Sequence, residues 1–102
     1  MREAVAQNLG TPLETLSRLA EDEDGWVREA VAQNPSTPLE ILAKFAESGD
    51  SEARKYVARN PSTSPEILIK LSRDEVGYVR QFVAKNPNTP LETLARLAKD
   101  ES

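Results

Sequence analysis

The sequence predicts an all-α fold, a right-handed solenoid of four two-helix repeats, and three observations support it. The first is a strict 26-residue period without any insertion, followed by Asn8, Asn34, Asn60 and Asn86. The second is helical spacing of the apolar residues within each copy. The third is a proline directly after the Asn in the last three copies. Since 4 × 26 = 104 and the chain has 102 residues, one repeat domain fills it, with copies at about 1–25, 26–51, 52–77 and 78–102.

The second copy shows how the first helix of each pair arises. Val27, Ala30, Val31 and Asn34 recur at the spacing i, i+3, i+4, i+7, which places them on one face of a helix over residues 26–34. Pro35 follows, and the residue before a proline is driven out of the α region. The first helix therefore ends at this point.

A capping-box pattern opens the second helix of the pair. In the segment Thr37-Pro38-Leu39-Glu40, Thr is the expected N-cap, Pro the first helical residue and Glu the reciprocal partner. We expect this helix to run to about Ala46, and the same structural role for the whole Thr column, Thr11, Thr37, Thr63 and Thr89. Helices this short are marginal alone in water, so the copies must stack on one another. Whether one helix of each pair is α or 3₁₀ stays open at this length.

Residues 27–46 resemble the leucine-rich repeat variant family. They match its pattern V-R-x-x-V-A-x-N-P-x-T-P-x-x-x-L-x-x-L-A, and the match extends over essentially the whole chain. The resemblance implies a right-handed superhelix of alternating α and 3₁₀ helices. It implies no reaction that could be transferred to particular residues. The first copy departs from the pattern at Leu9-Gly10, and the cysteine-rich iron–sulfur segment of some family members has no counterpart in this cysteine-free sequence.

Composition excludes several classes of chemistry. The sequence has no His and no Cys, which removes zinc, haem and iron–sulfur ligand sets and the Ser-His-Asp and Cys-His catalytic arrangements. We therefore expect no enzymatic activity, no cofactor and no metal. No apolar run approaches the roughly 18 residues of a membrane span, and no signal-peptide core is present, so we expect a cytoplasmic protein without a membrane contact.

The recurring Asn column predicts a structural role. Asn34 shares the apolar face of its helix, so its amide should point inward, where it must be hydrogen-bonded. Stacked helices lie roughly 8–10 Å apart, too far for one Asn side chain to reach the next. We expect Asn8, Asn34, Asn60 and Asn86 each to bind backbone of their own turn or of the neighbouring one.

A second recurring column is basic and consists of Arg2, Arg28, Arg54 and Arg80. Each Arg lies in the first turn of its helix, where the helix dipole disfavours a cation, so each should have a specific partner. We expect loop carbonyls or a loop acid such as Asp22 or Asp74. The alternative is a ladder that recognises an acidic peptide or protein surface.

Two aromatic residues, Trp26 and Tyr78, occupy one repeat column at the start of the first helices. We expect them to pack at the edge of the array. The alternative is that they anchor a protein interface.

These observations favour a non-catalytic scaffold or protein-interaction module whose protein or peptide partner the sequence does not identify. A nucleic-acid-binding repeat is the alternative, supported by the two C-terminal copies of net charge +1 each but disfavoured by the net charge of −4. An engineered or excised array without a native partner is a further alternative. Because both ends of the array are apolar and of opposite charge, we also expect head-to-tail self-association.

Overall fold

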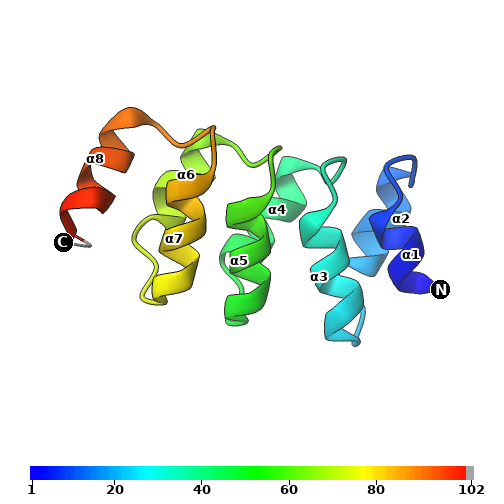
Figure 1. The fold of residues 1–102 in the computed structure, drawn as a ribbon. Helices are drawn as coiled ribbons and strands as arrows, with labels where there is room; N and C mark the ends of the chain where they lie inside the picture. The colour runs from blue at the N-terminus through cyan, green and yellow to red at the C-terminus, as the bar shows by residue number, and fades with distance from the viewer. Residues whose placement is uncertain (101–102) are drawn as a thin grey trace.

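The structure, a computed structural model, describes residues 1–100 and forms four helix pairs arranged in a row (Figure 1). The first helices of the pairs are α1 (Arg2–Gln7), α3 (Gly25–Gln33), α5 (Ser51–Arg59) and α7 (Gly77–Lys85). The second helices are α2 (Leu13–Leu19), α4 (Leu39–Ala46), α6 (Pro65–Leu71) and α8 (Leu91–Asp100). The row measures 43 × 21 × 18 Å, so the predicted helical-repeat array is confirmed.

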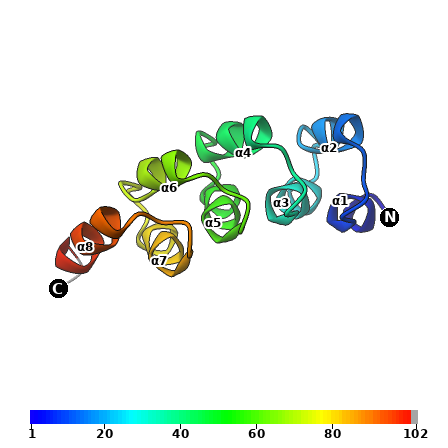
Figure 2. The same cartoon turned by 90° about the horizontal axis from the view of Figure 1, so that it is seen from above.

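The row is curved, and the first helices line its inner side (Figure 2). A column of small residues explains the close approach of successive first helices. Ala6, Ala32 and Ala58 are fully buried, whereas Ala84, in the last first helix, is exposed because no further copy covers it. An alanine at this contact lets two helix backbones approach closely, while larger side chains fill the space under the second helices. The array therefore bends toward the first helices.

Each pair buries its apolar stripe against its neighbours. Leu16, Leu42 and Leu68 of the second helices are at most 1% exposed, and Val31 and Val57 of the first helices are fully buried. Full burial of one such side chain contributes about 1.5–3 kcal/mol. Because these residues touch the next copy as well as their own pair, stacking provides the core that a single pair lacks.

The asparagines connect consecutive copies, as expected. Asn60 Nδ2 donates to the backbone carbonyls of Ala32 and Asn34 in the preceding copy, at 2.8 and 3.0 Å, and its Oδ1 accepts from the backbone N–H of Ser62. The same pattern recurs at Asn34 and Asn86. Each amide thus fixes its own turn and satisfies carbonyls at the end of the preceding first helix.

The predicted capping role of the threonines is wrong. The Thr37 hydroxyl donates to the carbonyl of Val31 at 2.6 Å, and Thr11, Thr63 and Thr89 make the equivalent bond. Pro38, with an extended ψ of 151°, takes the N-cap position. The Val31 carbonyl, which also accepts from the backbone N–H of Asn34, lies in the last turn of the first helix, so each threonine closes the first helix rather than opening the second.

The second helix of the third copy has a side-chain cap. Ser64 occupies the N-cap and accepts a hydrogen bond from the backbone N–H of Ile67, while Pro65 is the first helical residue. Pro65 lies 26 residues after Leu39, the first residue of α4, so the displaced proline does not shift the start of the helix.

The alternation of α and 3₁₀ helices implied by the family resemblance is also wrong for the described residues. Every helix among them is α-helical, including the short second helices. Leu42 N–H bonds to the carbonyl of Pro38 and Leu68 N–H to that of Ser64, both i to i−4. The i to i−4 hydrogen bonds give 3.6 residues per turn, which brings the leucines of each second helix onto one buried face.

Candidate functional site

The first helices α3, α5 and α7 lie on the inner side of the arc (Figure 2), and each carries exposed or half-buried side chains at the same repeat positions. The neighbouring positions of these helices are turned into the core, so these side chains are the part that the second helices leave uncovered. We call this set the inner face. Its residues are Trp26, Glu29, Gln33, Glu52, Lys55, Tyr56, Arg59, Tyr78, Gln81, Phe82 and Lys85.

Cations and aromatic rings alternate along the C-terminal half of the inner face. Lys55 Nζ lies 4.7 Å from the centroid of the Tyr56 ring. Arg59 Cζ lies 5.8 Å from the Tyr56 centroid and 5.1 Å from that of Phe82. Lys85 Nζ follows at 5.4 Å from the Phe82 ring. These separations are those of cation–π contacts, so the rings hold the basic groups against the surface of two successive copies.

Two pockets open on this part of the inner face, and they are equivalent by the repeat. The first, of about 110 Å³, is lined by Gln33, Tyr56, Arg59, Asn60 and Pro61. The second, of about 230 Å³, is lined by Arg59, Phe82, Lys85, Asn86 and Pro87. Each lining residue of the second lies 26 positions after its counterpart in the first. The fold thus places an aromatic wall and a basic side chain in two successive pockets.

The N-terminal half of the inner face is acidic. Burial, followed by the nearby charges of Glu52 and Asp50, raises the pKa of Glu29, which has no ion pair within residues 1–100. Glu52 does have a partner, because Lys55 Nζ lies 2.9 Å from its carboxylate. This hydrogen bond lowers the pKa of Glu52 and raises that of Lys55. The face therefore changes from acidic to basic between α3 and α7.

The aromatic column behaves differently in its two copies. Trp26, the second residue of α3, is 71% exposed, so the expected edge packing is wrong for this residue. Tyr78 is 37% exposed, and its hydroxyl forms a hydrogen bond of 2.5 Å with that of Ser51 in the preceding copy. Only Tyr78 lies within reach of the basic side chains, through Lys55.

The arginine column binds loop backbone, as expected. Arg28, Arg54 and Arg80 each donate to the carbonyl six residues earlier, which belongs to Asp22, Ser48 and Asp74, at 2.6–2.7 Å. Each guanidinium thereby fixes the loop that leads into its own helix. These positions lie beside the loops, apart from the inner face, so the column forms no continuous ladder with the pockets there.

Two of the arginines, Arg54 and Arg2, also form an ion pair with an aspartate of a loop. Asp74 accepts two hydrogen bonds from Arg54, at 2.6 Å from Nε and 3.2 Å from Nη2, and this raises the pKa of Arg54. The side chains are only 12% and 7% exposed. Arg2 lies 3.5 Å from Asp22 in a more open version of the same contact. Both expected acids therefore serve as partners, each from the following loop.

The sequence interpretation missed the basic and aromatic residues that line the paired pockets. Tyr56 and Phe82 occupy a column that holds alanine in the first two copies, and Arg59 and Lys85 occupy one that holds glutamine there. These two columns lie about one helical turn apart on the same face. Joint variation of the two columns between copies was the available signal.

The described residues contain neither a candidate metal site nor a candidate membrane span. Residues 1–100 contain no group of three or more acidic side chains placed to hold a metal ion. None of the helices described is long and apolar enough to cross a bilayer.

Comparison with protein families matches nearly the entire chain. The model of the Leucine Rich Repeat Variant domain matches residues 27–74, and the model of the Leucine rich repeat variant matches residues 1–24 and 79–102. Neither the curated proteins nor the solved structures include a match. The four-copy period, the helix pairs and these matches together place the chain in the leucine-rich repeat variant family.

Proposed function

We propose that this protein is a non-catalytic interaction module that binds an acidic peptide segment of a partner protein along its inner face. The observation that carries the proposal is the pair of equivalent pockets, each with an aromatic wall and a basic side chain. The columns that hold the array together are nearly constant, whereas the inner face differs from copy to copy. Variation at exposed positions on a constant frame is typical of repeat proteins that bind partners.

The repeat spacing fits one peptide conformation. Neighbouring helices pack roughly 8–10 Å apart, which sets the step from one pocket to the next. A polyproline II helix has three residues per turn and rises about 3.1 Å per residue, so equivalent side chains recur about every 9 Å on the same side. Two carboxylates three positions apart would therefore face Arg59 and Lys85 together.

Charge favours a peptide over a nucleic acid. A nucleic-acid strand carries a phosphate at every nucleotide, and the same face presents Glu29 and Glu52 beside the basic pockets. The chain also has a net charge of −4. A peptide carries charge only where its sequence puts it, so it can place acids against α5 and α7 and a basic residue against Glu29.

The test compares two fluorescein-labelled peptides of identical composition, Pro-Pro-Glu-Pro-Pro-Glu-Pro-Pro and Pro-Pro-Glu-Pro-Glu-Pro-Pro-Pro. Fluorescence anisotropy should show tighter binding of the first, because only its carboxylates share one side of the polyproline helix. The double variant R59Q/K85Q should weaken that binding at least about tenfold, or about 1.4 kcal/mol.

The matched control is the double variant K44Q/K70Q, which removes the same charge from exposed positions on the second helices. It should bind the first peptide like the unmodified protein. Equal effects of the two double variants, or no preference between the peptides, would overturn the proposal. Tighter binding of a single-stranded RNA oligonucleotide, lost in R59Q/K85Q, would assign the inner face to nucleic acid instead.

A further inference from the structure

One arginine of the repeat lacks the acid that its counterparts have. The turn before each first helix holds Asp22, Ser48 and Asp74 at equivalent positions. Each side-chain oxygen accepts a hydrogen bond from the backbone N–H two residues later, at 2.9–3.0 Å. Ser48 therefore preserves the conformation of the turn but brings no carboxylate to it.

The residue affected by this serine is Arg28. By the repeat, Ser48 stands to Arg28 as Asp74 stands to Arg54 and Asp22 to Arg2. Within residues 1–100, Arg28 makes one hydrogen bond, from Nη1 to the carbonyl of Asp22 at 2.6 Å, and no ion pair. Its Nε and Nη2 correspond to the two atoms that bind Asp74 in Arg54.

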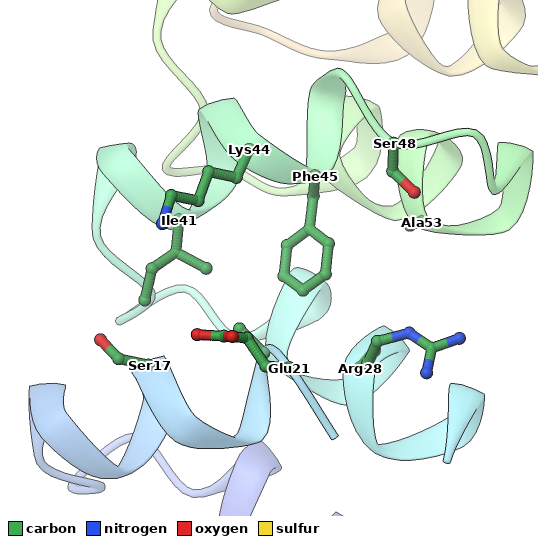
Figure 3. Close-up of a pocket in the computed structure, with 9 residues that line it drawn as sticks. Ser17, Glu21, Arg28, Ile41, Lys44, Phe45, Ser48 and Ala53 are labelled. Atoms are coloured by element: carbon green, nitrogen blue, oxygen red, sulfur yellow. The ribbon is translucent and has the colours of Figure 1, made fainter. Parts of the chain in front are cut away.

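A pocket of about 400 Å³ adjoins this guanidinium (Figure 3). Phe45 and Ile41, 7% and 8% exposed, form its apolar wall, and Ser48 and Arg28 lie at one side of it. The carboxylate of Glu21 points away from Arg28 in Figure 3, toward the side where Lys44 extends. The volume lies in the range of small-molecule sites, and the wall is that of a site for an apolar ligand.

We propose that this pocket binds a small organic monocarboxylate with an apolar body. The carboxylate accepts hydrogen bonds from Arg28 in place of the missing aspartate, a pairing for which the planar guanidinium is suited. The apolar body lies against Phe45 and Ile41.

Binding at this position also affects the array. Asp74 ties the loop between α6 and α7 to α5 through Arg54, and the ligand would tie the loop between α4 and α5 to α3 in the same way. A ligand that binds only the folded chain stabilises it by RT ln(1 + L/Kd), where L is the free ligand concentration. The melting temperature should therefore rise with the concentration of the carboxylate.

The test uses 3-phenylpropionate as the probe and 3-phenylpropionamide as its neutral control, with the full chain. Calorimetric titration and thermal melts should show binding of the carboxylate only, and the Arg28 Nε–H resonance should shift in the NMR spectrum. The proposal does not depend on the inner face, so R59Q/K85Q should bind the probe normally.

Two variants decide the matter. S48D supplies the missing carboxylate, so it should raise the melting temperature without ligand and weaken probe binding at least about tenfold, about 1.4 kcal/mol. R28Q should also lose the probe, whereas R73Q, at an exposed arginine away from the pocket, should retain it. Equal binding of the amide, undiminished binding by S48D, or no binding of the carboxylate at millimolar concentration would overturn the proposal.

Discussion

Asn60 Nδ2 donates a 3.0 Å hydrogen bond to the backbone carbonyl of Asn34, the residue that stands 26 positions earlier in the same column. The amide also reaches the carbonyl of Ala32, at 2.8 Å. Both carbonyls lie at the end of α3, where no further turn of the helix supplies a backbone N–H to them. The end of each first helix is thus completed by the asparagine of the next copy, so stacking supplies hydrogen bonds as well as apolar contacts.

Replacing Asn60 by Ala should destabilise the array by about 1–3 kcal/mol, because it leaves the buried Ala32 carbonyl without a donor, removes one of the two hydrogen bonds to the Asn34 carbonyl and opens the turn at Ser62. The matched control is Asn8→Ala. Asn8 is exposed and makes only the turn bond, to the N–H of Gly10. Thermal or urea unfolding measures both, and an equal loss for the two variants would contradict the bridging role.

Two adjacent residues have different roles: Thr63 binds a carbonyl at the end of α5, and Ser64 caps the start of α6. Thr63→Val keeps the shape but removes a buried hydrogen bond to the Val57 carbonyl, which then keeps only the backbone N–H of Asn60, so it should cost about 1–1.5 kcal/mol. Ser64→Ala loses only a long N-cap bond of 3.3 Å and should cost about 1 kcal/mol or less. Urea unfolding of both variants tests the order. If Ser64→Ala proved the more damaging, the cap would be the main polar contact of this corner.

Arg54→Ala should cost far more stability than Lys70→Ala. Removing Arg54 leaves the nearly buried Asp74 carboxylate unpaired, and breaking such a pair costs about 3–5 kcal/mol. Lys70 has an exposed ion pair with Glu47 at 3.3 Å, worth about 0.2–1 kcal/mol. Similar small losses in denaturant melts would show that the Arg54 pair does not hold the loop between α6 and α7 against α5.

Two neighbouring glutamates should respond to pH in opposite directions. Burial raises the folded-state pKa of Glu29, so its contribution to stability falls as pH rises through that pKa, and E29Q should be more stable than the unmodified protein at about pH 7. The Lys55 hydrogen bond lowers the pKa of Glu52. Its stabilising contribution is present above the unfolded value and lost as pH falls through the folded one, so E52Q should be less stable at about pH 7.

Thermal melts at about pH 7 and about pH 3 check both expectations, because Glu29, with its raised pKa, is largely protonated at the lower pH, and the contribution of Glu52 falls as the pH approaches its lowered pKa. The two differences from the unmodified protein should shrink there. A stabilising effect of E29Q that persisted at the lower pH would have a cause other than the charge of Glu29.

The period and the helical spacing of the sequence were sufficient to predict the helix pairs and their stacking, because local pattern and global fold agree at nearly every position. The inward role of Asn34 and the loop partners of Arg54 followed from the same logic of burial and polar satisfaction. Thr37 was assigned wrongly because its capping pattern is local, whereas the carbonyl of Val31 that it binds is brought close only by the tight turn between the two helices.

The candidate sites were harder to predict because they lie where the copies differ. The Arg column is identical in all four copies and so indicates a ladder that includes Arg28. The difference lies in Ser48, whose departure from aspartate gives Arg28 its different environment. The basic and aromatic residues of the inner face, such as Tyr56 and Arg59, come together across two copies only after stacking. Which first-helix positions remain uncovered depends on the curvature of the array, which the repeat pattern alone does not specify.

The central claim is that the inner face of α5 and α7 binds acidic peptide segments whose carboxylates match the repeat spacing. Amide and side-chain NMR shifts during titration with Pro-Pro-Glu-Pro-Pro-Glu-Pro-Pro test it most directly, because they locate the contact on the unmodified chain. We predict the largest shifts at Tyr56, Arg59, Phe82 and Lys85, with small shifts on α4 and α6. Shifts concentrated on the second helices, or none at saturating peptide, would contradict the account.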